Sequence, residues 1–265
     1  MNRKSIVKKS KRIVVKIGSS ILCDEKGFFS PSRVERISKQ ILDLLKASRE
    51  VVLVSSGAIA CGMDMLRLAR RPKELPLLQA CAAIGQGKLM KVYESYFVGK
   101  KIHTAQVLVT RDIFQERERY LNTRNTLDAL LELKALPIVN ENDTVATEEI
   151  RFGDNDQLSA VVSQTIKADL LINLSNVNGL LNEEGKVVTV ITGIHELKSA
   201  RKWLFTSHKE KTVGGMTSKL EAAKMMMQSG IPMIIANGHD SKIIQKILEG
   251  EDAGTLFLGQ RKGKS

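Results

Sequence analysis

The chain has 265 residues, of which 43% are hydrophobic and 26% charged, a balance typical of a folded globular protein and not of a disordered one. Aromatic residues make up only 4%, which disfavours a surface that stacks the bases of single-stranded nucleic acid. No apolar run reaches the roughly 18 residues needed to span a membrane, and three cysteines without a C-x-x-C pair indicate a reduced, cytoplasmic protein.

The net charge of +12 would favour a nucleic-acid-binding protein if it were spread over the fold. Most of it lies at the two ends: residues 1–12 carry six basic side chains and no acidic one, and residues 260–265 carry three basic ones. We therefore predict solvated basic tails at 1–11 and 260–265 around a single domain at 12–259. A nonspecific contact between these tails and nucleic acid is the alternative.

The first half of the chain alternates short apolar runs with longer amphipathic segments. Residues 12–18 predict a buried strand, and residues 30–48 predict a helix with Ser30 as its N-cap and Pro31 in its first turn. Residues 50–62 predict a strand that runs into a turn of small residues and a helix. The elements predicted next are a helix at 77–97, a strand at 105–110, a helix at 120–135 and a strand at 136–143.

The second half continues the alternation, with one interruption. Residues 179–191 predict a hairpin that turns at Glu184–Gly185. The other predicted elements are a helix at 155–168, a strand at 169–175, a helix near 195–205, a loop at 206–215, a helix at 216–229, a strand at 232–236, a helix at 240–249 and a strand at 254–259. This order predicts an α/β fold in which helices cover both faces of an open, mainly parallel sheet.

Four polar or glycine-rich stretches follow predicted strands. They are KIGSS at 16–20, SSGA at 55–58, NENDTV at 140–145 and SNVNG at 175–179. Ligands of open α/β sheets collect at the carboxyl ends of the strands. We therefore expect these stretches to border one crevice, together with the acid–amide cluster of FGDNDQLSA at 152–160.

Two lysines accompany glycine turns. Lys16 precedes Gly18, and Lys219 ends the stretch VGGMTSK at 213–219. Backbone N–H groups of such turns can bind phosphate, and a lysine adds positive charge. Neither stretch is a Walker A loop, and no G-x-G-x-x-G occurs, so a dinucleotide-binding fold has no support. Taken singly, each lysine also fits a surface side chain beside a simple turn.

The set of motifs is more informative than any single one. It holds two lysines, two acid–amide clusters and no histidine placed as a general base. Phosphoryl transfer to a carboxylate suits this set, because a carboxylate is already ionised at neutral pH. Lysines, Mg²⁺ and backbone N–H groups would screen its repulsion from the γ-phosphate of ATP. Acid and amide side chains would hold an ammonium group of the acceptor.

Five segments, in this order, resemble the glutamate 5-kinase branch of the amino acid kinase family. They are VVKIGSSIL, VLVSSGAIACG, LNTRNTLDALLELKALPIVNENDTV, FGDNDQLSA and GGMTSKLEAAKMMMQSGI, and the similarity runs from about residue 12 to 258. The resemblance implies a three-layer αβα sandwich and ATP-dependent phosphorylation of the γ-carboxylate of L-glutamate, the first step of proline biosynthesis. It also implies Mg²⁺, proline as a feedback inhibitor, and a homo-oligomer.

The resemblance also implies roles for individual residues. Lys16 and Lys219 would contact the transferring phosphoryl group, and Asp156 would orient both lysines. Glutamate would lie against Ser56, Gly57, Ala58, Asn140, Asp143 and Asn155. ATP would lie against Lys16, Gly18, Ser19, Ser175, Asn176 and a loop formed by Val213, Gly214, Gly215, Met216, Thr217, Ser218 and Lys219. No residue is implied as a metal ligand.

The sequence departs from the family pattern in several places. Many members have Thr-Asp where this chain has Ser175-Asn176, and a threonine where Val213 stands. The stretch GLLNEEGKV lacks the usual acid–proline ending, and we expect the protein to lack the C-terminal domain of the kind found in RNA-modifying enzymes that many bacterial members carry. The alternative within the family is another carboxylate or carbamate kinase, such as an acetylglutamate kinase, although Asp143 and Asn155 suit a free α-ammonium group better than an acetylated one.

Overall fold

The computed structural model describes residues 2–110, 116–145, 155–206 and 210–259, and only the backbone for residues 201–206 and 210–214. Eight strands of the described chain form one sheet in the order β3-β4-β2-β1-β5-β7-β8-β6. Neighbouring strands run parallel except β7 and β8. The strands are β1 (Arg12–Ile17), β2 (Glu50–Ser55), β3 (Thr104–Val109), β4 (Leu136–Glu141), β5 (Leu170–Ser175), β6 (Val190–Ile191), β7 (Met233–Asn237) and β8 (Thr255–Phe257).

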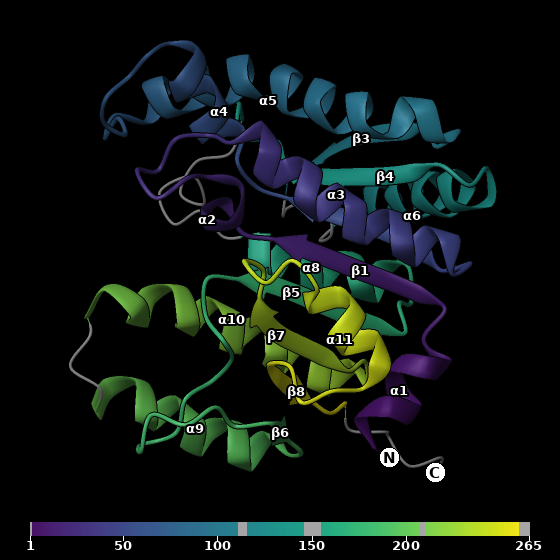
Figure 1. The fold of residues 1–265 in the computed structure, drawn as a ribbon, viewed down its shortest axis with the longest axis vertical. Helices are drawn as coiled ribbons and strands as arrows, with labels where there is room; N and C mark the ends of the chain where they lie inside the picture. Colours follow the sequence, from purple (N-terminus) through teal and green to yellow (C-terminus); the bar gives the residue numbers. More distant parts are fainter. Residues whose placement is uncertain (1, 111–115, 146–154, 207–209, 260–265) are drawn as a thin grey trace.

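Helices cover both faces of this sheet (Figure 1). They are α1 (Arg3–Lys9), α2 (Ser19–Leu22), α3 (Pro31–Lys46), α4 (Ala58–Met65), α5 (Leu75–Phe97), the 3₁₀ turn η1 (Val98–Lys100), α6 (Arg117–Glu132), α8 (Asn155–Thr165), α9 (Ile194–Thr206), α10 (Glu210–Ser229) and α11 (Ile243–Glu249). This architecture confirms the predicted α/β sandwich with its mainly parallel sheet.

The central strand β1 shows how the sequence builds two cores. Successive side chains of a strand point to opposite faces. Ile13, Val15 and Ile17 therefore join one buried cluster, which includes apolar residues of α3, α5 and α11. Val14 joins the other cluster, which includes residues of α6, α8 and α10. Because both faces are covered, β1 is apolar on both faces from Ile13 to Ile17 except at Lys16, as expected for a parallel sheet.

Several helix boundaries differ from those predicted. Ser30 occupies the N-cap position of α3, but its side chain makes no capping hydrogen bond, whereas Pro31 does begin the helix. Helix α11 begins at Ile243 instead of residue 240, because Asp240 forms a turn in which its carboxylate accepts the Lys242 N–H. The predicted turn at Glu184–Gly185 is present: Gly185 has φ +75°, and Leu181 and Val187 form an antiparallel bridge across it.

The prediction of a solvated tail at residues 1–11 is wrong for its helical part. Residues 3–9 form α1, in which Ile6 and Val7 join the core. The Arg3 guanidinium is buried and donates to four backbone carbonyls, at 2.7 Å to Thr189, 2.9 Å to Glu251, 2.9 Å to Ala253 and 3.0 Å to Gly254. We call this set of four hydrogen bonds the Arg3 clasp. The basic sequence of residues 1–12 gave no sign of it, because the accepting carbonyls come from segments that are distant in the sequence. The predicted tail at 260–265 lies outside the described residues.

Helices α4 and α5 come into direct backbone contact at two glycines. A Cβ added to Gly85 would lie 1.9 Å from the carbonyl oxygen of Ala58, and one added to Gly62 would lie 1.9 Å from that of Cys81. Since Ala58 begins α4 directly after the turn that follows β2, this close crossing fixes the position of that turn. The glycines thus hold one wall of the crevice at the sheet edge.

We expect the substitution Gly85→Ala to destabilise the fold by about 1–3 kcal/mol, because the added methyl group meets backbone atoms that cannot move aside cheaply. Gly87→Ala is the matched control on the same helix, since a Cβ there meets nothing within 4 Å. The control should be stabilised by up to about 1 kcal/mol through helix propensity. Urea unfolding of both variants measures the difference, and equal stabilities would contradict the close crossing.

Candidate active site

The carboxyl ends of four neighbouring strands meet at one edge of the sheet. Strands β1, β2, β4 and β5 are parallel neighbours, so the residues after Ile17, Ser55, Glu141 and Ser175 lie along this edge. Helix α8 begins at the same edge and packs against these strands (Figure 1). The sheet topology therefore gathers stretches that are up to 160 residues apart in the sequence (residue 16 to residue 175).

Asp156 lies between the two lysines singled out in the sequence. Lys16 donates to its Oδ1 atom, and Lys219 donates to its Oδ2 atom at 3.0 Å. Asn173 and Ser218 also donate to this carboxylate, at 2.8 Å and 2.7 Å. The exposed fractions of Lys16, Asp156 and Lys219 are 4%, 2% and 8%. Two buried cations thus share one buried anion, which leaves a net positive charge that can attract a phosphate.

The surroundings of Asp156 keep its carboxyl group ionised. Burial alone would raise its pKa, but the charges of Lys16 and Lys219, with the hydrogen bonds from Lys16 and Asn173, outweigh burial and hold the pKa of Asp156 well below its ordinary value. The carboxylate therefore stays negatively charged over the whole physiological range. It can hold both ammonium groups in fixed positions without exchanging a proton.

A helix occupies the region predicted as a loop over the phosphates of ATP. Helix α10 begins at Glu210, so residues 213–219 lie within it and not before it. Glycine is less favourable than alanine in a helix by about 1 kcal/mol, which discourages a helix at Gly214 and Gly215 but does not forbid one. The helical backbone carries Ser218 and Lys219 together to Asp156, and the Lys219 ammonium also donates to the Gly215 carbonyl at 3.1 Å.

The other predicted nucleotide residues line the same sheet edge. Gly18 donates its N–H to the Leu174 carbonyl at 3.0 Å, so that N–H is engaged within the protein. Ser175 ends β5, and its hydroxyl donates to the exposed Asn176 side chain at 3.3 Å. Ser175 also pairs in register with Asn237 of β7. These positions put Ser175 and Asn176 beside the turn that carries Gly18.

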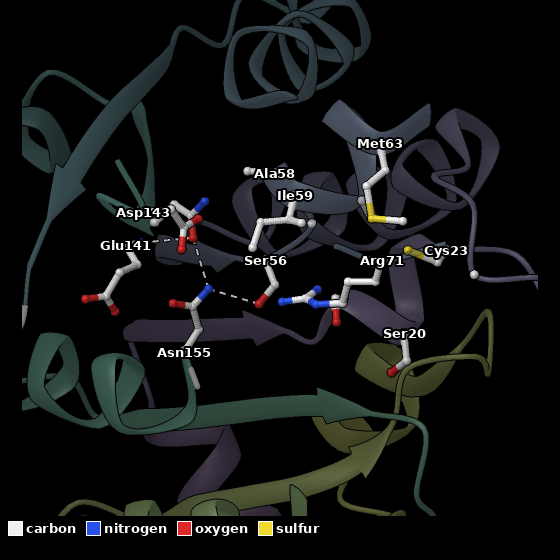
Figure 2. A pocket seen from close by; sticks show the side chains of 15 residues that line it. Ser20, Cys23, Ser56, Ala58, Ile59, Met63, Arg71, Glu141, Asp143 and Asn155 are labelled. Carbon is white, nitrogen blue, oxygen red and sulfur yellow. Dashed lines mark hydrogen bonds between the residues drawn. The ribbon is translucent and has the colours of Figure 1, made fainter. Parts of the chain in front are cut away.

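A pocket of about 280 Å³ opens beside the lysine cluster. All six residues predicted to contact glutamate line it: Ser56, Gly57, Ala58, Asn140, Asp143 and Asn155. Ser19, predicted at the nucleotide, lines it as well. Figure 2 shows Asp143, Glu141 and Asn155 at one end of the pocket and Arg71 pointing toward Ser56 from the other. The pocket is thus small, partly apolar, and oppositely charged at its two ends.

Asn155 organises the polar end of the pocket. Its amide nitrogen donates to the Ser56 hydroxyl at 2.9 Å, the Asn140 side-chain oxygen at 3.0 Å and the Ser55 carbonyl at 3.1 Å (Figure 2). Asn140 in turn donates to Gln86 at 2.8 Å. Gly57, the N-cap residue of α4, has φ +105° and so lies in the left-handed region that favours glycine. A non-glycine residue there would strain the wall of the pocket.

Asp143 is a titratable group of this pocket whose pKa is shifted toward neutrality. Burial raises the pKa of Asp143 to about 6, although the positive charge of Arg71 opposes the rise. The carboxylate is therefore ionised at neutral pH but takes up a proton in mildly acidic solution. An ammonium group bound beside it would favour the ionised form.

Two consecutive residues connect the pocket with the lysine cluster. Asn155 faces the pocket, whereas Asp156 faces the lysines, and both stand in the first turn of α8. Because they are adjacent on a rigid helix, the distance between the two half-sites is fixed. A carboxylate held in the pocket can therefore meet a phosphate held by the lysines.

Sequence reasoning missed several residues of the site. Arg71, Glu141, Cys23 and Met63 line the pocket, and Asn173 contacts Asp156. Asn173 could have been predicted, because it is a lone amide within the apolar run of β5, where a buried polar group needs a hydrogen-bond partner. Arg71 could not have been predicted, since an arginine in a polar loop is most often a solvated side chain.

The described residues contain neither a cluster of metal-binding side chains nor a helix that could span a membrane. No three histidine, cysteine, aspartate or glutamate side chains among them gather closely enough to hold a metal ion. In the same part of the chain, no helix combines the length and apolar character that crossing a bilayer requires.

The fold and the site define an α/β phosphotransferase, and comparisons with known proteins identify its family. The family model described as "Amino acid kinase family" matches residues 11–237. Two similar curated proteins are both named "Glutamate 5-kinase". The one from Geobacter sp. (strain M21) is 41% identical over 97% of this chain and 70% of its own length, and the one from Carboxydothermus hydrogenoformans is 44% identical over 98% of this chain and 71% of its own length. The chain therefore belongs to the amino acid kinase family, and within it to the glutamate 5-kinases.

A solved structure supports the fold independently of close sequence similarity. The UMP kinase from Bacillus anthracis superimposes with a TM-score of 0.61 over 94% of this chain and 96% of its own, at 17% sequence identity. This likeness extends to the arrangement of the sheet and helices, and at such low identity it bears on the fold alone.

Proposed function

We propose that this chain transfers the γ-phosphoryl group of ATP to the γ-carboxylate of L-glutamate and forms L-glutamyl 5-phosphate, the first step of proline biosynthesis. The observation that carries the proposal is the adjacency of Asn155 and Asp156, which joins a pocket for an amino acid to a cationic cluster for a phosphate. The membership among glutamate 5-kinases supports the same reaction.

In the proposed reaction, an oxygen of the γ-carboxylate attacks the γ-phosphorus, and the bond to the β-phosphate oxygen breaks as ADP leaves. No general base is required, because the attacking carboxylate is already ionised. Lys16 and Lys219 reduce the repulsion between the two anions and stabilise the charge on the transferring group. Asp156 acts through these lysines by fixing their positions.

Mg²⁺ fits this reaction as part of the ATP complex. Among the described residues, no three carboxylate, histidine or cysteine side chains lie close enough together to hold a metal ion. This agrees with Mg²⁺ bound mainly through the phosphates of ATP, because Mg²⁺ is commonly held by substrate phosphates with few protein ligands. When bound, it would neutralise charge on the phosphates. The protein residues would hold the phosphoryl group through Lys16 and Lys219.

The amino-acid end of the substrate would be held by the polar end of the pocket. We assign the α-ammonium group to Asp143, with Asn140 and Asn155 as further hydrogen-bond partners. Proline carries the same ammonium and α-carboxylate, so we propose that it competes for this pocket. Inhibition by proline that glutamate cannot overcome would place proline at a different site.

A substrate panel tests the proposal. L-glutamate, L-aspartate and N-acetyl-L-glutamate are each incubated with ATP and Mg²⁺, and ADP release and hydroxylamine-trapped acyl phosphate are measured. We expect turnover with L-glutamate alone. Preferred turnover of N-acetyl-L-glutamate would favour an acetylglutamate kinase, and a salt-sensitive shift of RNA without any turnover would favour a nucleic-acid-binding protein. The further assignments, to the cytoplasm and to a homo-oligomer, are tested by cell fractionation and light scattering.

The pH dependence of glutamate use should follow the protonation of Asp143. Because its pKa is about 6, the Asp143 carboxylate takes up a proton and loses its negative charge as the pH falls through that value. The γ-carboxyl group of free glutamate, with an ordinary pKa near 4.3, stays ionised over the same range. We therefore expect kcat/KM for glutamate to fall about tenfold per pH unit below pH 6. The Asp143→Asn variant should lack this fall, and an identical profile in both proteins would contradict the assignment.

A further inference from the structure

Arg71 is the cationic residue of the substrate pocket. Of the fifteen described residues that line the pocket, it alone carries a positive charge, whereas Glu141 and Asp143 carry negative ones. In Figure 2 its guanidinium group points toward the Ser56 hydroxyl, from the side opposite to Asp143. The pocket therefore has an anionic end and a cationic end.

The fold fixes where this guanidinium group enters. Arg71 lies in the loop between α4 and α5, whose ends are held by the close crossing at Gly62 and Gly85. Pro72 follows it and restricts the backbone of Arg71 to extended conformations. Leu68 of the same loop packs against the core. The side chain is exposed to solvent, but the backbone that carries it is anchored on both sides.

The charges of glutamate match this pocket in one orientation. Its ammonium group suits Asp143, and its γ-carboxylate must reach the phosphoryl group beside Lys16 and Lys219. The α-carboxylate then remains without a cation unless Arg71 provides one. We propose that Arg71 binds the α-carboxylate of the substrate and so selects α-amino acids over amines or acids of the same length. This inference rests on the proposed function, since it concerns the substrate of that reaction.

The planar guanidinium group explains why an arginine suits this task. It offers two parallel N–H donors to a carboxylate, a geometry that a lysine ammonium group cannot reproduce. Its charge also reaches Asp143, whose pKa it lowers against the effect of burial. Arg71 would thus keep Asp143 available for the ammonium group while it holds the neighbouring carboxylate.

Substrate analogues that lack one group each test the inference. 4-Aminobutyrate lacks only the α-carboxylate of glutamate, and glutarate lacks only its ammonium group. The Arg71→Met variant should raise the KM for glutamate and the Ki of glutarate by about ten- to a hundredfold. It should leave the Ki of 4-aminobutyrate unchanged and alter kcat by only a few-fold. Arg71→Lys should recover part of the loss, because it restores the charge without the paired donors.

Arg70→Met is the matched control, since Arg70 is an exposed neighbour that does not line the pocket, and it should behave as the unaltered protein. Asp143→Asn should weaken glutamate without weakening glutarate. Equal losses for glutamate and 4-aminobutyrate, or an unchanged Ki of glutarate in Arg71→Met, would overturn the inference. Turnover of glutamate by the unaltered protein is measured first, so a failure of the proposed reaction is recognised separately from a failure of the role of Arg71.

Discussion

Replacing Asp156 with asparagine is expected to lower kcat by roughly 10²-fold or more, the scale of losing one preorganised electrostatic contact. The substitution removes the only negative charge that the buried Lys16 and Lys219 share in the described site. It also replaces one carboxylate oxygen with an amide NH₂ group. In the unaltered protein both oxygens accept hydrogen bonds, so in the variant a donor would face another donor. The lysines would shift when charge moves across the phosphoryl group, so the transition state suffers more than substrate binding.

The competing explanation is that Asp156 only stabilises the start of α8. Asparagine serves about as well as aspartate at a helix N-terminus, so this explanation predicts a nearly normal kcat. Asp169→Asn is the matched control, because the exposed Asp169 accepts the N–H groups of Lys11 and Arg12 at the opposite edge of the sheet. The Tm of each variant is measured first, and kcat is then measured at a temperature at which every variant is folded. A lower kcat under these conditions reflects lost activity and not lost stability. A normal kcat in Asp156→Asn would leave the lysines without their proposed organiser.

Replacing Asp143 with asparagine is expected to raise the KM for glutamate by about ten- to a hundredfold and to leave the KM for ATP near its original value. The change preserves size but removes the charge that we assign to the substrate ammonium group. A hydrogen bond to a charged group contributes about 1.5–3 kcal/mol, and the partial exposure of Asp143 favours the lower part of that range.

The control for this substitution is Asp64→Asn, an exposed aspartate on α4 that does not line the pocket. Its KM values for both substrates should stay unchanged. Parallel increases in both KM values for Asp143→Asn would show that Asp143 belongs to the nucleotide side of the site. The assignment of the ammonium group would then move to Glu141, the other carboxylate in the pocket.

The sequence predicted the sheet well because its signal is local. Apolar runs of about six residues, each followed by glycine or polar residues, are characteristic of buried parallel strands, and all seven strands predicted this way are present. The two-residue strand β6 falls at the end of the predicted hairpin and pairs with β8. Its pairing depends on a partner far along the chain, so no local pattern could have located it.

The site was predictable where residue type limits the possible roles. Clusters such as NENDTV and FGDND predict acids and amides at strand and helix ends, and the fold brings Asn140, Asp143, Asn155 and Asp156 to one edge of the sheet. The start of α10 was not predictable, because two glycines suggest a loop more strongly than a helix. Arg71 and Arg3 were not predictable for another reason. Each meets its surroundings only after distant segments have packed, and nothing in the neighbouring residues marks it.

The Arg3 clasp constrains the order in which segments of the protein can pack during translation. The carbonyls that accept hydrogen bonds from its guanidinium group belong to Thr189 and to residues 251–254, so α1 docks against segments that are translated 186 to 251 residues later. Strands β1 to β4, by contrast, can pair with one another well before the ribosome reaches residue 250. Helix α1 must therefore stay undocked until residues 251–254 have been translated. Its three lysines would keep it in solution during that interval, and a fusion partner placed before Arg3 would interfere with this docking.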